Sequence, residues 1–159
     1  MTKPWIAPDL HALLTKVSDE QILALTLFGE ASSEPIEGIV AVGNVIANRR
    51  TDEQQRWGRT WRRVCLQPSQ FSCWNPIGGE KNYARLLKMT TAVVEQGKAL
   101  KHPPFEQCAW VALGIARNAL FDRVKHSNHY HTAALSPRPS WAQNRIPALQ
   151  VHRHVFYAL

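Results

Sequence analysis

A capped and strongly apolar segment near the N-terminus constrains the fold of this chain more than any other feature. Ser18 and Gln21 stand in the pattern S-x-x-Q, which is typical of a capping box at the start of a helix. The apolar positions that follow are Ile22, Leu23, Leu25, Leu27 and Phe28. They are too numerous for one face, so we predict a helix that is buried on most sides and ends near Glu30.

Further helices are expected after this one. We predict that Ser33 caps a second helix with Pro35 in its first turn, and that Arg49 and Arg50 suit the negative C-terminal end of that helix. Two more helical segments follow a long aromatic loop region without periodicity, and the pieces HYH and HVFY near the C-terminus are typical of strands. The expected ranges are 34–50, 81–100 and 105–121 for the helices and 51–80 for the loop region.

The length of 159 residues is typical of one compact domain. Residues 1–17 contain a short apolar patch, and we expect them to form an N-terminal arm on a single domain of residues 18–159. The cysteines at 65, 73 and 108 cannot all pair with one another and lack CxxC spacing, so free thiols are expected instead of disulfides or a structural zinc site.

The sequence predicts neither a membrane span nor an export signal. No stretch approaches the roughly 20 apolar residues that cross a bilayer, and the N-terminal segment lacks an apolar region followed by a cleavage site. We therefore expect the protein to be made without a signal peptide. We also expect it to be a monomer.

The net charge of +7 predicts an anionic polymer as the binding partner. The excess is arginine, concentrated around residues 49–63 and towards the C-terminus. Nucleic acid and the anionic surface of a bacterial envelope both carry the required charge, and charge alone does not separate them.

Glu30 is the candidate catalytic residue. A carboxyl group that closes an apolar helix is poorly hydrated, which favours its protonated form and suits it to general acid catalysis. Cleavage of a glycoside requires such a proton donor for the departing oxygen. A solvated helix end is the ordinary alternative, and periodicity does not decide between them.

Residues 24–49, which read ALTLFGEASSEPIEGIVAVGNVIANR, resemble the signature of the SleB-type cell-wall hydrolases. This family includes spore cortex-lytic enzymes and phage lysins. Three further pieces resemble the family in the same order, and they are QFSCW at 70–74, HY with PSWA between 129 and 142, and H-x-FY at 154–157.

The resemblance implies a lysozyme-like domain, mainly α within an α+β fold, with a small extended region lining the cleft. It implies cleavage of peptidoglycan between N-acetylmuramic acid and N-acetylglucosamine without a cofactor, and it places the catalytic glutamate of a G-E-A motif on Glu30. Many members are lytic transglycosylases, in which one carboxyl group protonates the leaving oxygen and then deprotonates the muramic C6 hydroxyl. The product is a 1,6-anhydro end. A muramidase with the same acid remains the alternative.

Other carboxylates are weaker candidates for catalysis. We interpret Glu34 and Glu37 as residues that serve the positive end of the second helix, which leaves a single catalytic acid. Asp52 and Asp122 are expected in or beside loops, and nothing around them indicates a role.

The substrate groove is expected at the QFSCW segment, because sugar rings stack on aromatic faces while polar groups fix their hydroxyls. The predicted contacts are Gln70, Phe71, Ser72 and Trp74, with His129, Tyr130 and Trp141 on the opposite wall. The alternative places Phe71 and Trp74 in the core and makes Trp141 a structural plug.

Two rival functions remain from the sequence. His129 and His131 alternate on a predicted strand, and His152 with His154 repeats the spacing. Such pairs suit a zinc-dependent amidase or endopeptidase. No HExxH motif is present, however, and no metal is expected. The arginines and tryptophans of 49–74 suit a nucleic-acid-binding module. We favour the wall enzyme, in the form of a phage-type endolysin that collects in the host cytoplasm and then reaches the wall.

Overall fold

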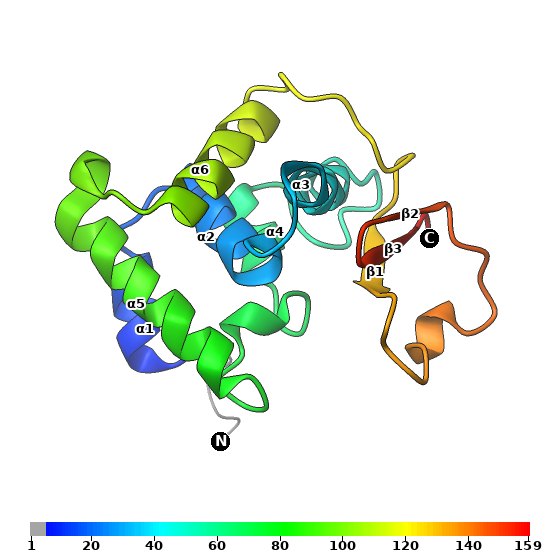
Figure 1. Cartoon of the computed structure of the whole chain (residues 1–159), viewed down its shortest axis with the longest axis horizontal. Helices are drawn as coiled ribbons and strands as arrows, with labels where there is room; N and C mark the ends of the chain where they lie inside the picture. The colour runs from blue at the N-terminus through cyan, green and yellow to red at the C-terminus, as the bar shows by residue number, and fades with distance from the viewer. Residues whose placement is uncertain (1–5) are drawn as a thin grey trace.

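The computed structural model describes residues 6–159, in which six α-helices stand beside a small three-stranded sheet (Figure 1). This confirms the predicted mainly helical α+β fold. The helices are α1 (Pro8–Leu14), α2 (Asp19–Ala31), α3 (Ile36–Arg50), α4 (Trp61–Cys65), α5 (Glu80–Gln96) and α6 (Pro103–Ala116). Short helical turns are η1 (Ser72–Trp74), η2 (Gly97–Ala99) and η3 (Ser140–Ala142), and the strands are β1 (His129–Thr132), β2 (Leu149–Val151) and β3 (His154–Tyr157).

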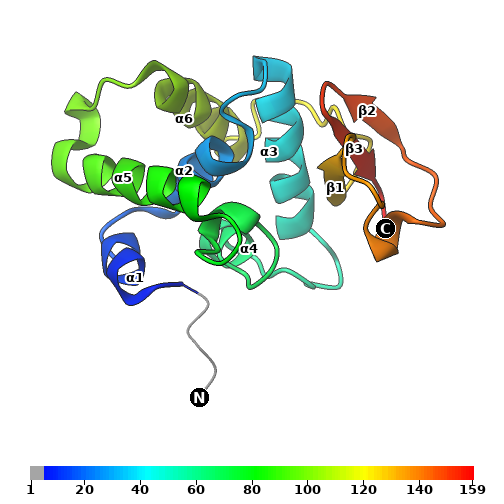
Figure 2. The ribbon, with the colours of Figure 1, turned by 60° about the horizontal axis from the view of Figure 1, so that its bottom comes forward.

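Helix α2 is the centre of the helical part, as its sequence predicts. The capping box forms, because the Gln21 N–H donates to Ser18 Oγ at 3.1 Å and the Ser18 N–H donates to Gln21 Oε1 at 2.8 Å. Figure 2 shows α2 enclosed among α3, α4, α5 and α6, all of which contact it. The buried side chains of α2 thus hold its C-terminal end, and with it Glu30, at a fixed place.

Helix α3 stands between the helical part and the sheet. Gly43 allows α6 to approach, since a Cβ at this position would lie 3.0 Å from Ile115, and Ala41 with Val45 packs on Phe156 of the sheet. The predicted cap at Ser33 is wrong, because α3 begins at Ile36 after Pro35. The Ser33 hydroxyl instead accepts a hydrogen bond from Arg153 at 2.8 Å.

Two helices end earlier than their apolar patterns predict. Helix α5 ends at Gln96, and Gly97 follows it with a φ of 53°, which is in the left-handed region that glycine adopts readily. Helix α6 ends at Ala116, and Asn118 follows it with a φ of 52°. These backbone changes end the helices although apolar residues continue along the chain.

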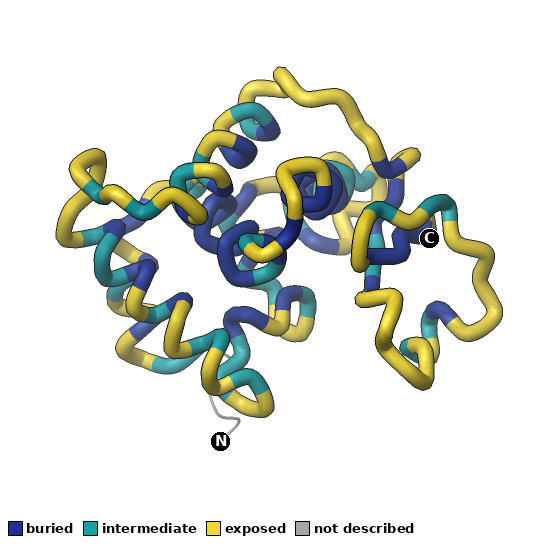
Figure 3. Tube along the Cα trace, viewed as in Figure 1, coloured by how far each residue is buried: buried dark blue, intermediate teal, exposed yellow. Residues whose placement is uncertain are grey.

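The antiparallel sheet has the order β1–β3–β2 and presents two different faces. Tyr130 pairs with Phe156 in the register, and this face packs on α3, while His129 and His131 lie on the other face with Trp141. Figure 3 shows that β3 is buried, whereas the loop joining β1 and β2 is exposed over most of its length. Tyr130 is thereby directed towards the helices.

Two further predictions concern the whole of the described chain. Within residues 6–159, no helix is both long and apolar enough to cross a bilayer. Cys65, Cys73 and Cys108 are buried and unpaired, which confirms the expectation of free thiols.

The predicted N-terminal arm, residues 1–17, lies partly outside the described residues. Its described part contains α1, whose Leu10 and Leu14 are buried in the core.

Candidate active site

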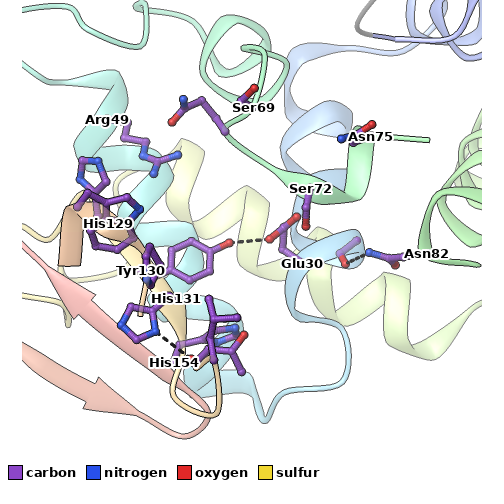
Figure 4. Close-up of a pocket in the computed structure, with 16 residues that line it drawn as sticks. Glu30, Arg49, Ser69, Ser72, Asn75, Asn82, His129, Tyr130, His131 and His154 are labelled. Atoms are coloured by element: carbon purple, nitrogen blue, oxygen red, sulfur yellow. Dashed lines mark hydrogen bonds between the residues drawn. The ribbon is translucent and has the colours of Figure 1, made fainter. Parts of the chain in front are cut away.

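A cavity of about 770 Å³ lies between the helical part and the sheet. Gly29 and Glu30 at the end of α2, with Ser72 of η1, form one side of it. The strand β1 contributes Tyr130 to the opposite side, as the close-up in Figure 4 shows. The predicted catalytic residue therefore lines a space large enough for sugar rings.

The carboxylate of Glu30 is held by two hydrogen bonds from opposite sides of the cavity. The backbone N–H of Cys73 donates to Oε1 at 3.0 Å, and the hydroxyl of Tyr130 donates to Oε2 at 2.8 Å (Figure 4). Both oxygens are thus fixed by groups from segments far apart in the sequence. Such fixed geometry is what a proton donor needs to reach a leaving oxygen.

Helix α5 secures the end of α2 that carries Glu30. Asn82 donates to the carbonyl oxygen of Gly29 at 3.0 Å, and Arg85 donates to that of Phe28 at 3.1 Å. These carbonyls belong to the last turn of α2, where carbonyl groups lack partners within the helix. The two side chains of α5 therefore fix the backbone beside the catalytic candidate.

Gly29 allows the segment with Cys73 to approach α2 closely. A Cβ at position 29 would lie 2.6 Å from the Cβ of Cys73, a separation that real atoms do not tolerate. The absence of a side chain brings the Cys73 N–H within reach of Glu30. This close approach explains why a glycine precedes the glutamate in the G-E-A motif.

The two groups beside Glu30 remain protonated at neutral pH. Burial, together with the nearby charge of Glu30, raises the pKa of the Tyr130 hydroxyl well above its ordinary value. The same two causes raise the pKa of the Cys73 thiol. Tyr130 consequently acts as a neutral hydrogen-bond donor and does not compete with Glu30 for the role of base.

Within the described residues, Glu30 is the one carboxylate on the cavity wall. Glu34 is buried in an ion pair with Arg153, and Asp52 pairs with Arg56 at 2.9 Å. Asp122 accepts hydrogen bonds from the backbone of its own loop, and Glu37 lies in the first turn of α3, 4.0 Å from His152. None of these four lines the cavity.

The QFSCW segment divides between the cavity and the core. Gln70 and Ser72 line the cavity, as predicted for substrate contacts. Phe71 and Trp74 require a correction, because their side chains are 1% and 0% exposed and do not reach the groove. The indole N–H of Trp74 donates to Thr26 inside α2 at 3.2 Å. These two aromatic residues hold the segment against the core while its polar residues face the cavity.

The residues predicted for the opposite wall of the groove lie together in the structure. His129, Tyr130 and Trp141 all line the cavity, and the ring of Trp141 lies 5.0 Å from that of His129 and 5.3 Å from that of Tyr157. Trp141 therefore packs on the sheet and also presents a surface to the cavity. Burial, with the charges of Arg49 and Arg56, lowers the pKa of His129 to about 4, so this ring is neutral at neutral pH.

Several cavity residues were not predicted from the sequence. They include Arg49, Ser69, Asn75, Asn82, His131 and His154. Arg49 was interpreted as a partner of the helix dipole, yet it is buried and donates from Nε to the carbonyl of Asn128 at 2.7 Å. Asn128 is distant in the sequence, so no local pattern indicates this contact.

The histidine pairs do not assemble a metal centre among the residues described. His129 and His131 share a face of β1, as predicted, but His152 is exposed in the turn between β2 and β3 with a φ of 47°. Across residues 6–159 no group of three or more His, Cys, Asp or Glu side chains is arranged to hold a metal ion. His131 instead contacts the Tyr157 hydroxyl at 3.1 Å.

Comparison with known proteins identifies the family. No curated protein and no solved structure shows significant similarity to this chain. The sequence pattern of the family described as Cell Wall Hydrolase, however, matches residues 33–157. This match covers most of the chain and begins at Ser33, just after Glu30, so it supports the family independently of the proposed acid. The chain belongs to the cell wall hydrolase family, whose members act on peptidoglycan, as the resemblance to the SleB-type enzymes predicted.

Proposed function

We propose that this cell wall hydrolase is a glycosidase that cleaves the bond between N-acetylmuramic acid and N-acetylglucosamine, acting as a lytic transglycosylase with Glu30 as its acid and base. The observation that carries the proposal is the solitary carboxylate on the described cavity wall. A hydrolase with two carboxylates needs a second acidic group about 5–9.5 Å from the first, across the scissile bond. A transglycosylase needs one.

The hydrogen bonds of Glu30 determine where its proton lies before the reaction. The Cys73 N–H can only donate, so Oε1 must remain an acceptor. A proton on Glu30 is therefore carried by Oε2, beside Tyr130, whose hydroxyl can accept as well as donate. Oε2 is the atom that delivers the proton to the glycosidic oxygen.

The second half of the reaction uses the carboxylate that remains. Once Oε2 has given up its proton, it accepts again from Tyr130, while Oε1 keeps the bond from Cys73. The carboxylate then removes the proton of the muramic C6 hydroxyl, and the oxygen of that hydroxyl bonds to C1 to close the 1,6-anhydro ring. Glu30 regains the proton that it donated, so the cycle is complete without water.

We expect muropeptides released from purified sacculi to end in 1,6-anhydro-N-acetylmuramic acid. Mass spectrometry of the digest measures this directly, because an anhydro end is lighter by one water than a reducing end. A digest with only reducing muramic ends would contradict transglycosylation and support the muramidase. Reducing N-acetylglucosamine ends or free stem peptides would contradict the proposed bond.

The positive charge is proposed to hold the enzyme on the anionic envelope, in keeping with a phage-type lysin. The net charge of +7 favours encounter with a polyanion, and added salt screens this attraction. We expect the lytic rate on whole sacculi to fall about tenfold between low and high salt. A short soluble glycan fragment is the control, since its smaller charge leaves its cleavage nearly unchanged. Equal rates on sacculi at both salt concentrations would contradict the attraction.

A further inference from the structure

Arg49 is a buried cation beside the proposed catalytic pair. Its side chain is 4% exposed, and its guanidinium lies between two aromatic rings, with Cζ 5.3 Å from the centre of Trp57 and 5.1 Å from that of Phe71. Attraction between the cation and these ring faces offsets part of the cost of burial. The position of the guanidinium is fixed further by the bond from Nε to Asn128.

No carboxylate neutralises this cation by direct contact within the described residues. The ion pairs of that part of the chain do not include Arg49, and its Nη1 is buried without a hydrogen-bond partner. A buried charge without a counter-ion destabilises a fold, so its retention favours a functional reason. Figure 4 shows Arg49 on the same side of the cavity as Tyr130, whose hydroxyl reaches Glu30.

On α5, the charged Arg85 binds the carbonyl oxygen of Phe28 and the hydroxyl of Ser32, on the two sides of Glu30 in the sequence. Five titratable groups of the other segments around Glu30 are neutral at neutral pH. Burial raises the pKa of Tyr130 and Cys73 well above their ordinary values and that of Cys65 to about 12. Burial lowers the pKa of His129 to about 4 and also lowers that of His154. These groups come from η1, α4, β1 and β3.

Three further groups complete the surroundings. Both ring nitrogens of His131 have oxygen partners, in Thr132 and Tyr157. The charges of Glu34 and Arg153 compensate each other in their ion pair. Arginine remains charged at every pH at which proteins are folded, even though burial lowers the pKa of Arg49. Arg49 therefore supplies a permanent positive charge near Glu30.

We propose that Arg49 is a positioning residue that acts through Tyr130 to stabilise the negative charge that Glu30 carries after it has given its proton to the glycosidic oxygen. The inference rests on the proposed function, because it assigns Arg49 a part in the same proton transfers. The charge favours departure of the proton to the glycosidic oxygen and steadies the carboxylate until it takes the C6 proton.

Arg49→Met is expected to lower kcat about tenfold and to leave KM nearly unchanged, because the negative charge left after proton transfer loses its stabilising cation. The alkaline limb of the kcat profile is expected to move about one pH unit upward. Arg49→Lys keeps the charge and returns the limb towards its wild-type position. A merely structural role lowers the rate without moving the limb.

Arg50→Met is the matched control, since Arg50 is the next residue of α3 and also stacks on an aromatic ring, with Cζ 4.4 Å from the centre of Trp61. Arg50 does not line the cavity, so the alkaline limb of the kcat profile is expected to stay in place in Arg50→Met. If Arg49→Met does not fold, the kcat–pH profile of the wild-type enzyme is measured at several salt concentrations. A buried charge is poorly screened, so the alkaline limb is expected to keep its position as salt is added.

Two results overturn the inference: an alkaline limb of the wild-type enzyme that moves with salt, or an alkaline limb that is unmoved in folded Arg49→Met. If the proposed function itself is wrong, folded Glu30→Gln retains activity. This result separates a failure of the proposed function from a failure of the inference about Arg49.

Discussion

Replacement of Trp74 by alanine is expected to lower the free energy of unfolding by about 3–5 kcal/mol, which is a large part of the stability of a domain of this size. The indole is 0% exposed and holds η1, the segment that also carries Ser72, against α2. Its removal leaves a large cavity and also deprives the buried hydroxyl of Thr26 of a partner. Denaturant unfolding followed by circular dichroism measures the change.

Trp110→Ala is the matched control for this prediction. Trp110 lies on α6 with 79% of its surface exposed, so its loss is expected to change the stability by no more than about 0.5 kcal/mol. Because Trp74 supports Cys73, whose N–H holds Glu30, activity falls together with stability. If Trp74→Ala has unchanged stability and a raised KM, Trp74 contacts the substrate, and its assignment to the core is contradicted.

The local signals of the sequence identified the central helix, and the resemblance to the G-E-A motif indicated the candidate acid at its end. The capping box and the apolar run of α2 depend on neighbours in the chain, and both are visible without the fold. The cap predicted at Ser33 failed because Pro35 sets the start of α3 and Arg153, distant in the sequence, binds the Ser33 hydroxyl. A cap residue is indistinguishable in sequence from one that has a tertiary partner.

The cavity wall shows the same division between local and distant contacts. Gln70 and Ser72 were predicted together with Phe71 and Trp74, because a loop without periodicity does not reveal which side chains turn inward. Tyr130 was predicted as a substrate contact, and its bond to Glu30 follows only from the packing of β1 beside α3.

Glu30→Gln is expected to lower the rate of wall cleavage at least about 1000-fold, since general acid and base steps each contribute about 100- to 10,000-fold. Glutamine has the size of glutamate, and its amide oxygen still accepts from the Cys73 N–H, while its NH₂ donates to the Tyr130 oxygen. The fold is therefore expected to remain intact while the transferable proton is lost.

Glu37→Gln is the matched control, because Glu37 has a side chain that is 58% exposed in the first turn of α3 and does not line the cavity. The most direct measurement compares muropeptide release by the two variants with that of the wild-type protein, at equal concentration and with matching circular dichroism spectra. We predict release at the wild-type rate by Glu37→Gln and none above background by Glu30→Gln. Wild-type release by a folded Glu30→Gln would contradict the assignment of Glu30 as the acid.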